Sequence, residues 1–244
     1  MLVETEVANM VVEILYNEIC NNNGDGQNVT YLQATLPEAQ FVFTKLNDEP
    51  YFIVNDPDIV YIGSMSEATQ RRVIEKLAPY KERIIQLIEK GTPILATGNA
   101  GDIFCKSIHY VTEKIEVEGL GIFNFDVKTD WFKRYHSKVL GKLDDISIVG
   151  FRAQFNFVYG DNSDCYFLKC QRGVGINPDS KLEGFRKNNL ICTHILGPIL
   201  PLNPLFCEYF LKLAGSNAEA AYKDAAMLAY EQRLKEFTDP ATAF

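Results

Sequence analysis

No run of apolar residues in this sequence approaches the roughly 20 that a membrane-spanning helix needs. The N-terminus has neither the basic residues nor the apolar block of a signal peptide. Positive charge is also scarce: 24 lysines and arginines stand against 32 aspartates and glutamates, a formal charge of −8. This deficit argues against a broad phosphate-binding surface. We therefore expect a cytoplasmic protein with no membrane span and no nucleic-acid partner.

Cysteine and histidine are sparse. The 244 residues include six cysteines, no two of them at Cys-x-x-Cys spacing, and three histidines. Scattered cysteines in a chain of this length favour reduced, mostly buried thiols over a disulfide framework. His109 and His136 have no companions at the spacing of metal ligands. We expect neither a metal nor another cofactor.

Hydrophobic residues, by contrast, make up 47% of the chain, which is enough to build a substantial core. The sequence contains no internal repeat, no low-complexity segment and no long linker. A chain of this size can fold as one large unit. We therefore predict a single domain over residues 1–244.

The first half of the chain alternates between helical and strand patterns. Apolar residues at three-to-four spacing predict helices over residues 4–20 and 67–90, and Pro79 must bend or split the second. The predicted strands are residues 29–35, 58–63 and 94–97, with an ambiguous segment, 41–54, that could hold a hairpin. This alternation implies a mostly parallel sheet with helices on both faces.

The second half is predicted to hold several strands followed by two helices. The strands are residues 118–125, 151–159, 164–170 and 189–196, and the helices are 204–214 and 217–237. In the second of these strands, aromatic residues alternate with Arg152, Gln154 and Asn156, which predicts a half-buried strand with those three side chains on its polar face. Ser216 and Glu219 have the spacing of a capping box at the start of the last helix.

A sharp turn from a strand toward a helix at residues 93–101 carries no nucleophile. The string PILATGNAG takes an apolar run into a glycine-rich turn whose tip offers Gly98, Asn99 and Ala100. In many α/β hydrolases the residue at the tip of such an elbow attacks the substrate. None of these three side chains carries a thiol or a hydroxyl group. The turn therefore has the form of a catalytic elbow without its central reagent.

Four strings, in this order, resemble the class I glutamine amidotransferases of the cobyric acid synthase (CobB/CobQ) type, in the branch of the amidotransferase subunit of lipid II isoglutaminyl synthase. They are YIGSMSEATQ (61–70), GTPILATGNA (91–100), EGLGIF (118–123) with a later Gly150-Phe151, and THILGPILPLN (193–203). The resemblance implies an α/β fold of the class I amidotransferase-like (flavodoxin-like) kind, a three-layer sandwich with a mostly parallel central sheet. Members usually begin with a strand before the first helix. Here Met1 lies almost at the predicted helix, so that strand is missing or the true start lies upstream.

The resemblance also assigns roles to positions. In this family an elbow cysteine attacks the side-chain amide of glutamine, and a histidine on the last strand acts as the base. Gly98, or Asn99 with a slip of one residue, stands at the cysteine position, and Leu196 stands at the histidine position. Backbone amides of the first glycine-rich turn stabilise the oxyanion, and there Ser64 and Met65 replace the usual small glycines. No catalytic residue is therefore expected at the family's positions.

A ligand pocket is expected where the family binds glutamine. Its expected lining is Gly63, Ser64, Met65, Asn99, Ala100, Arg152, Gln154 and His194. Asn99 can cap the helix after the elbow, or it can donate its amide to a carboxylate or phosphate. The string WFKRYH (131–136) mixes aromatic and basic residues and fits an exposed loop or an interface patch.

Two cysteines and one histidine are candidates for a rearranged catalytic site. Cys192 and His194 are two positions apart on one predicted strand and therefore face the same side. Cys105 lies seven residues beyond Gly98, or about 10 Å along a helix. Core thiols and a partly buried histidine bonded to the backbone are the simpler interpretation of all three.

The absence of both dyad members favours a protein that does not catalyse the family's reaction. A site stripped of its nucleophile and base retains about 10³–10⁴-fold catalysis, whereas enzymes commonly supply about 10⁶-fold or more. The leading hypothesis is a non-catalytic interaction or regulatory subunit in bacterial cell-wall metabolism, with a Mur ligase-like subunit or an amidotransferase paralogue as partner. One alternative is an active glutaminase subunit with a rearranged dyad. Another is a small-molecule binding protein that uses the glutamine pocket for a glutamine-like ligand.

Overall fold

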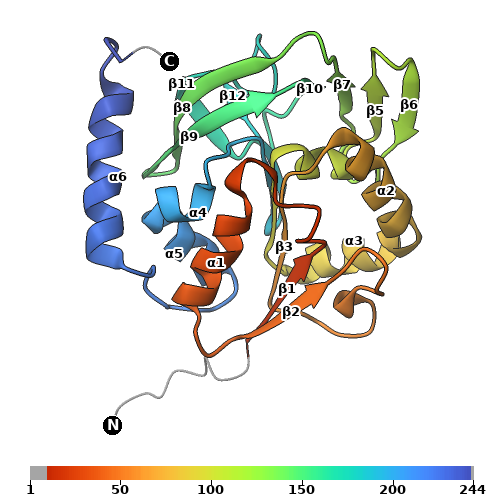
Figure 1. Cartoon of the computed structure of the whole chain (residues 1–244), viewed down its shortest axis with the longest axis horizontal. Helices are drawn as coiled ribbons and strands as arrows, with labels where there is room; N and C mark the ends of the chain where they lie inside the picture. The colour runs from red at the N-terminus through yellow and green to blue at the C-terminus, as the bar shows by residue number, and fades with distance from the viewer. Residues whose placement is uncertain (1–9, 243–244) are drawn as a thin grey trace.

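The central sheet has six strands in the order β13-β14-β4-β3-β1-β2, all parallel except the edge strand β13 (Figure 1). The computed structural model describes residues 10–242. The strands are β1 (Val11–Leu15), β2 (Gln40–Thr44), β3 (Ile59–Ile62), β4 (Ile94–Thr97), β13 (Phe185–Lys187) and β14 (Leu190–Thr193). Every residue of β3, β4 and β14 is buried, as expected for parallel strands covered on both faces.

Helices cover both faces of this sheet. On one face pack α2 (Glu67–Leu77), the 3-10 turn η3 (Ala78–Tyr80) and α3 (Lys81–Lys90). On the other pack α1 (Gly26–Thr35), α4 (Ile199–Leu202) and α5 (Pro204–Leu213). The predicted α/β fold with a mostly parallel central sheet between helical layers is confirmed. No helix among residues 10–242 is long and apolar enough to cross a membrane.

Two four-stranded sheets lie above the central sheet in Figure 1, in the orders β10-β7-β5-β6 and β12-β11-β8-β9. Their strands are β5 (Ser107–Tyr110), β6 (Ile115–Glu118), β7 (Asp126–Thr129), β8 (Tyr135–Leu143), β9 (Ile146–Gln154), β10 (Asn156–Tyr159), β11 (Leu168–Arg172) and β12 (Leu182–Glu183). Phe151 of β9 forms a bridge with Leu196, which ties the second sheet to the chain just beyond β14. The last helix, α6 (Lys223–Thr238), packs against β8 and β9.

The helix predicted over residues 4–20 is wrong. Residues 4–9 lie outside the described part of the chain, and Val11–Leu15 form β1, which pairs with β2 on one side and β3 on the other. A short apolar run fits a buried strand as well as a helix, so periodicity alone does not separate the two. The strand that the family places before its first helix is therefore present.

The strand predicted over residues 29–35 is also wrong, because this segment lies in α1. Parallel neighbours such as β1 and β2 need a crossover connection, which is usually a helix, and α1 is that crossover. Residues 41–54 hold most of β2 and the 3-10 turn η2 (Tyr51–Ile53), not a hairpin.

Pro79 divides the long helical region as predicted. It lies in η3, between the end of α2 and the start of α3. Gly91 follows α3 with a φ of 86°, the left-handed conformation that glycine adopts at many helix C-termini. The strands predicted at 58–63, 94–97 and 189–196 correspond to β3, β4 and β14, and the helix at 204–214 to α5.

Three late predictions are displaced or absent. Residues 119–125 form a loop after β6, and the strand expected at 164–170 begins only at Leu168. The final helix, α6, begins at Lys223 and not at 217. Ser216 accepts a hydrogen bond from the Ala218 backbone N–H at 3.2 Å and, like Glu219, lies before α6, so the predicted capping box does not form.

The polarity predicted for residues 151–159 is inverted. Arg152, Gln154 and Asn156 are buried, with 0%, 7% and 4% of their surfaces exposed, whereas the intervening Phe155 and Phe157 are half-buried. Alternation was predicted correctly, but the polar set faces the interior. The reason is that these side chains meet other buried polar groups near the end of β14, where they complete a hydrogen-bond network.

Candidate functional site

The turn after β4 places glycine where a catalytic elbow needs a side chain. Gly98 has a φ of +59° and begins the 3-10 segment η4 (Gly98–Phe104). A Cβ atom at this position would lie 2.5 Å from Ser64 Cβ and 3.2 Å from Leu196 Cδ2. A side chain here would therefore point toward Leu196, but it has no room unless Ser64 moves.

The backbone amides of the turn after β3 are already hydrogen-bonded within the protein. Ser64 N–H donates to Asp25 Oδ2 at 2.8 Å. Met65 N–H donates to Asn99 Oδ1 at 3.0 Å, and Asn99 Nδ2 donates to the Met65 carbonyl at 2.9 Å. The Ser64 hydroxyl donates to the Asn22 carbonyl at 2.8 Å. This turn presents neither of these two N–H groups to a ligand.

Asp25, which lies between η1 (Asn22–Gly24) and α1, also holds the turn after β3 in place. Its carboxylate is fully buried and also accepts from Thr97 Oγ1 at 2.7 Å, at the end of β4. Burial raises the pKa of Asp25, and the hydrogen bonds from Ser64 and Thr97 oppose that rise. The carboxylate therefore ties the ends of β3 and β4 together beneath the elbow.

A second buried carboxylate, Asp102 of η4, is the centre of a polar cluster. His194 Nε2 lies 2.9 Å from Asp102 Oδ1. Asn156 Nδ2 donates to Asp102 Oδ2 and lies 3.2 Å from His194 Nε2. Gln70 Nε2 donates to the Asn99 carbonyl at 2.6 Å and lies 3.5 Å from Asp102 Oδ2. The cluster joins α2, η4, β10 and the end of β14.

A buried ion pair fixes the backbone that carries His194. Glu183 Oε1 accepts from the His194 N–H at 2.9 Å and from Arg152 Nη2 at 3.0 Å. Glu183 Oε2 accepts from Thr193 Oγ1 at 2.9 Å. Arg152 and Glu183 are both fully buried. Arg152 therefore supports the site through Glu183, which explains why a charged residue lies on the inner face of β9.

A cavity of about 200 Å³ opens beside this cluster. Its walls come from residues 64–67, 98–99 and 153–156, with Asn22, Asn23, Arg134, His194 and Leu196. Of the expected pocket residues, Ser64, Met65, Asn99, Gln154 and His194 line it, whereas Gly63, Ala100 and Arg152 do not.

Sequence reasoning missed Asp102, Asn156 and Arg134 as parts of the site. A carboxylate four residues after the elbow, within an otherwise apolar segment, was the available signal for Asp102. Asn156 was recognised only as part of a face expected to be exposed. Nothing local distinguished Arg134 from the neighbouring basic residues.

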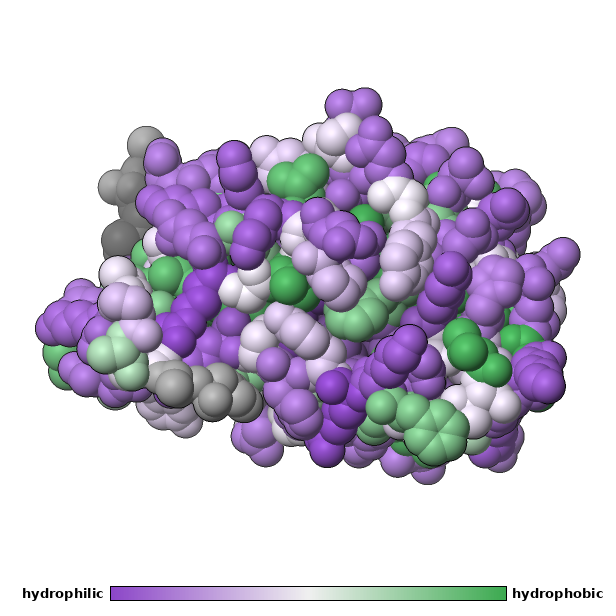
Figure 2. All heavy atoms as spheres, turned by 90° about the horizontal axis from the view of Figure 1, so that it is seen from above, coloured by the Kyte–Doolittle hydropathy of each residue, from purple (hydrophilic) through white to green (hydrophobic). Residues whose placement is uncertain are grey.

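Two residues that line the cavity, Phe155 and Arg134, contact each other beside an exposed aromatic and basic loop. Trp131 packs on Phe155 with ring centroids 5.8 Å apart, and the Arg134 guanidinium lies 5.7 Å from the Phe155 ring centre. Phe132 is 86% exposed. Figure 2, which views the molecule from above, shows a mostly hydrophilic face with apolar side chains in small separate groups. Residues 131–134 form an exposed loop, as predicted, whereas Tyr135 and His136 already belong to β8.

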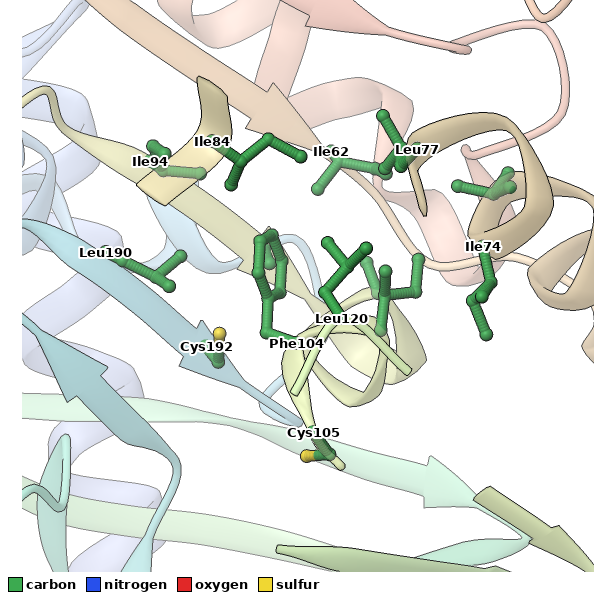
Figure 3. Packing of buried hydrophobic residues seen from close by; sticks show 14 of the residues in the cluster. Ile62, Ile74, Leu77, Ile84, Ile94, Phe104, Cys105, Leu120, Leu190 and Cys192 are labelled. Carbon is green, nitrogen blue, oxygen red and sulfur yellow. The ribbon is translucent and has the colours of Figure 1, made fainter. Parts of the chain in front are cut away.

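The candidate thiols lie away from the cavity. Cys192 and Cys105 are fully buried, and burial raises the pKa of each well above its ordinary value. Both belong to a cluster of buried apolar residues, in which Figure 3 shows Cys192 near Leu190 and Phe104, and Cys105 at the edge of the drawn group. Within the described structure no hydrogen bond joins Cys192 to His194, whose ring contacts Asp102 and Asn156 instead.

The other two histidines lie outside the cluster. His109 Nε2 lies 3.0 Å from the Ser107 hydroxyl, and His109 Nδ1 lies 3.4 Å from Glu116. His136 is exposed. Among residues 10–242, no group of three or more histidines, cysteines and carboxylates is placed to hold a metal ion.

Comparisons with known proteins agree with the fold. Residues 11–203 match the family model of the CobB/CobQ-like glutamine amidotransferase domain. The subunit GatD of the glutamine-hydrolysing lipid II isoglutaminyl synthase from Staphylococcus aureus (strain N315) is 29% identical over 170 residues, which cover 70% of this chain and 69% of GatD.

Two solved structures are similar in fold. One is a glutamine amidotransferase with a TM-score of 0.55 and 14% sequence identity. The match covers 84% of this chain and 99% of that protein's chain. The other, a glutamine amidotransferase from Thermotoga maritima, has a TM-score of 0.52 at 10% identity, with 93% and 91% covered. At such low identity these structures bear on the fold alone, and they match the architecture predicted from the sequence.

Proposed function

This chain belongs to the CobB/CobQ-like glutamine amidotransferase family, and we propose that it is a member that does not hydrolyse glutamine and acts as an interaction or regulatory subunit. The observation that carries the proposal is Gly98, a residue without a side chain at the left-handed tip of the elbow. Amide hydrolysis in this family needs a thiol at that point. A Cβ built on Gly98 would point at Leu196, the position that the family's base would occupy. Both reacting groups are therefore missing from one place.

The state of the turn after β3 supports the same conclusion. An oxyanion hole works because preorganised N–H donors point at the developing charge. Here the Ser64 and Met65 N–H groups are used by Asp25 and Asn99. A tetrahedral intermediate would have to displace a buried carboxylate or a side-chain amide to reach them. The site lacks its electrostatic component as well as its nucleophile.

A working glutaminase with a rearranged dyad is less well supported. His194 is held by Asp102 in an arrangement suited to a base, but a nucleophile must lie within hydrogen-bond reach of its base. The nearest thiol in sequence, Cys192, is fully buried with a raised pKa. A thiol that stays protonated and inaccessible does not attack an amide.

The partner is inferred from the relative. GatD is, by its name, one subunit of a glutamine-hydrolysing synthase. We infer by analogy that this chain is cytoplasmic and pairs with a Mur ligase-like subunit, or with an active amidotransferase paralogue, in bacterial cell-wall metabolism. Its role there would be to position or regulate the partner, not to supply ammonia.

A small-molecule binding role is the second candidate. It is favoured by the cavity of about 200 Å³, whose wall includes the buried polar side chains of Gln154, Asn156 and His194. Such a pocket with a few convergent polar groups is the ordinary form of a ligand site. The two candidates are compatible, since a regulatory subunit can sense a ligand.

Glutamine hydrolysis tests the main proposal. Purified protein is incubated with glutamine, alone and with a candidate partner that has been shown to be inactive by itself, and ammonia is measured. We expect no release above the buffer rate, and no stoichiometric mass shift with a diazo-ketone glutamine analogue. Release of ammonia that disappears in Cys192→Ala or Cys105→Ala would overturn the proposal.

A further inference from the structure

The two edges of the central sheet differ in how they are protected (Figure 1). At one edge, β13 is three residues long and includes two cations, and its Arg186 N–H donates to the Cys165 carbonyl at 2.7 Å. At the other edge, β2 has the sequence QFVFT, with no charge and no proline, and among residues 10–242 it pairs with β1 alone. Proteins usually protect an edge strand with charges, prolines or a covering segment, because its unpaired N–H and C=O groups attract another strand. The edge at β2 is therefore open to a second chain.

The register between β1 and β2 shows which backbone groups of this edge are unpaired. The Gln40 N–H and the Thr44 carbonyl both bond to the chain of β1, at 2.8 and 2.7 Å. Because the backbone groups of successive residues in a strand alternate between its two sides, the N–H and C=O groups of Phe41 and Phe43 point away from β1. Within the described part of the chain, no hydrogen bond uses these four groups.

The outward residues complement a second copy of themselves. The side chains of Phe41 and Phe43 lie on one face of the sheet, where Phe41 is half-buried and Phe43 is 45% exposed. Antiparallel pairing of two copies, centred on Val42, would place Phe41 of each copy opposite Phe43 of the other. Each such pair exchanges two N–H···O bonds, so all four outward groups of both strands are used and the aromatic side chains meet. A two-fold interface requires this kind of self-complementarity.

The segment that leads into this edge is nearly free of charge. Residues 26–44, which form α1, the connecting turn and β2, contain one charged residue, Glu38, whereas 23% of the whole chain is charged. The exposed side chains of α1 are uncharged as well: Gln27, Thr30, Gln33 and Ala34. Depletion of charged residues, with aromatic residues retained, is the composition of the core of a protein–protein interface.

The charges at the two ends of β2 favour the same pairing. Glu38 before the strand and Lys45 after it are both exposed, and neither forms an ion pair with another described residue. An antiparallel arrangement brings Glu38 of one copy to the end of the interface where Lys45 of the other copy lies. Opposite charges therefore meet at both ends, which supports a second copy as the occupant of this edge.

We propose that β2 is the interface of a homodimer, in which two copies pair antiparallel about a two-fold axis at Val42 and join their central sheets into one. This inference does not depend on the proposed function. The elbow follows β4, and β3 and β1 separate that strand from β2. Dimer formation and glutamine hydrolysis are measured separately, so either idea can fail without the other.

A charge exchange at the two-fold axis tests the register. Val42 is half-buried and belongs to none of the apolar clusters among residues 10–242, so a charged side chain can be placed there. In the proposed dimer it lies opposite its own copy, so Val42→Lys and Val42→Glu each place two like charges together. The masses of the parent and of both variants are measured by analytical ultracentrifugation on the full chain. Val111→Lys, at an exposed valine after β5, is the matched control.

We expect the parent to have twice the chain mass, and each Val42 variant to dimerise at least about tenfold more weakly. An equimolar mixture of Val42→Lys and Val42→Glu should recover the dimer, while Val111→Lys should match the parent. A parent that stays monomeric at about 100 µM would leave this edge to a different protein and overturn the proposal. Dimerisation that is unchanged in Val42→Lys, or not recovered in the mixture, would overturn it too.

A disulfide cross-link gives a second test that does not depend on charged variants folding. Opposed residues that do not exchange hydrogen bonds have Cα atoms about 4.5 Å apart, which suits a disulfide. In a Cys165→Ser background, Val42→Cys should therefore form a covalent dimer under mild oxidation. Gln40→Cys is the control, because the two copies of residue 40 would lie about 14 Å apart along the strands. Equal cross-linking at both positions would overturn the proposal, whereas ammonia release by the dimer would overturn only the proposed function.

Discussion

Asn99 holds the backbone of Met65 with both ends of its side-chain amide, accepting from the N–H at 3.0 Å and donating to the carbonyl at 2.9 Å. The residue next to the empty elbow tip thereby closes the turn that would hold an oxyanion. These two hydrogen bonds link the loops that follow β3 and β4. The residue that follows Gly98 therefore occupies the backbone N–H and carbonyl of Met65 in the neighbouring turn.

Asn99→Ala should destabilise the protein without creating activity. It removes two hydrogen bonds and leaves the Met65 N–H and carbonyl without these partners, for a loss of about 1–3 kcal/mol in the free energy of unfolding. Urea unfolding measures the loss. The matched control is Asn217→Ala, an exposed asparagine whose side chain makes no hydrogen bond within the described residues, where we expect a change within about 0.5 kcal/mol. Equal stability of both variants would contradict the bridging role, and ammonia release by Asn99→Ala would show that the turn alone blocked catalysis.

Restoring a cysteine at position 98 requires a second change at Ser64. Gly98→Cys alone should cost about 2–4 kcal/mol, because it combines a left-handed φ with a Cβ placed 2.5 Å from Ser64 Cβ. Ser64→Gly removes the clashing atom. In a double-mutant cycle measured by urea unfolding, the pair should therefore be coupled favourably by about 1–3 kcal/mol.

Gly215→Cys is a control that separates the cost of backbone strain at a positive φ from the cost of the steric clash with Ser64. Gly215 also has a positive φ, 77°, but a Cβ there would meet nothing within 4 Å. Its cost should equal the backbone strain alone, and Ser64→Gly should not change it. A Gly98→Cys variant no less stable than Gly215→Cys would rule out the steric argument. Adding Leu196→His to the Gly98→Cys/Ser64→Gly pair then asks whether the diazo-ketone analogue labels the rebuilt dyad.

Thiol reactivity should be confined to one cysteine in the native state. Cys165 is half-buried, whereas the other five cysteines are buried. Burial raises the pKa of Cys20, Cys170 and Cys207 to about 12, and that of the remaining two well above the ordinary value. At pH 8 a disulfide reagent should titrate at most one thiol quickly, and six after denaturation. Cys165→Ser should abolish the fast phase, and its persistence would place a second thiol at the surface.

The sequence predicted most of the elements whose signals are local. Local chemistry alone identified several features. The apolar run at residues 94–97 predicts a strand, Gly98 is free to adopt a positive φ, and Pro79 cannot continue a helix. The absence of a nucleophile at the elbow was equally visible. These features needed no knowledge of what packs against them.

The parts that were missed depend on distant neighbours. β1 is a strand because β2 and β3 pair with it on both sides, which no window of eleven residues reveals. The inward turn of Arg152 and Asn156 depends on Glu183 and Asp102, more than 30 residues away in each case. Alternation fixes the period of a strand but not which face is buried. A strand face with polar residues is therefore predicted to be exposed unless the buried polar groups that bond to those residues are known.

Stability should fall as the pH rises from the acid range toward neutrality through the titration of Glu13. This carboxyl is buried in the middle of β1, where it accepts from Thr44 Oγ1 at 2.6 Å, Tyr51 N–H at 2.7 Å and Phe52 N–H at 2.9 Å. Burial raises its pKa above 4.5, and these hydrogen bonds only partly oppose the rise. The folded state therefore binds the proton more tightly than the unfolded state does. The corresponding stability is fully present below pH 4.5 and is lost as the pH rises through the folded pKa.

Comparing variants isolates that contribution, because other groups titrate in the same range. Glu13→Gln removes the titration, and Glu89→Gln, at an exposed position of α3, is the matched control. Free energies of unfolding in urea are measured from pH 4 to pH 8 for both variants and the parent. The parent minus Glu13→Gln difference should decline with pH above about 4.5, while the parent minus Glu89→Gln difference stays flat. A difference that grew with pH would mean that the three donors outweigh desolvation and that the carboxylate, once ionised, stabilises the junction between β1, β2 and η2.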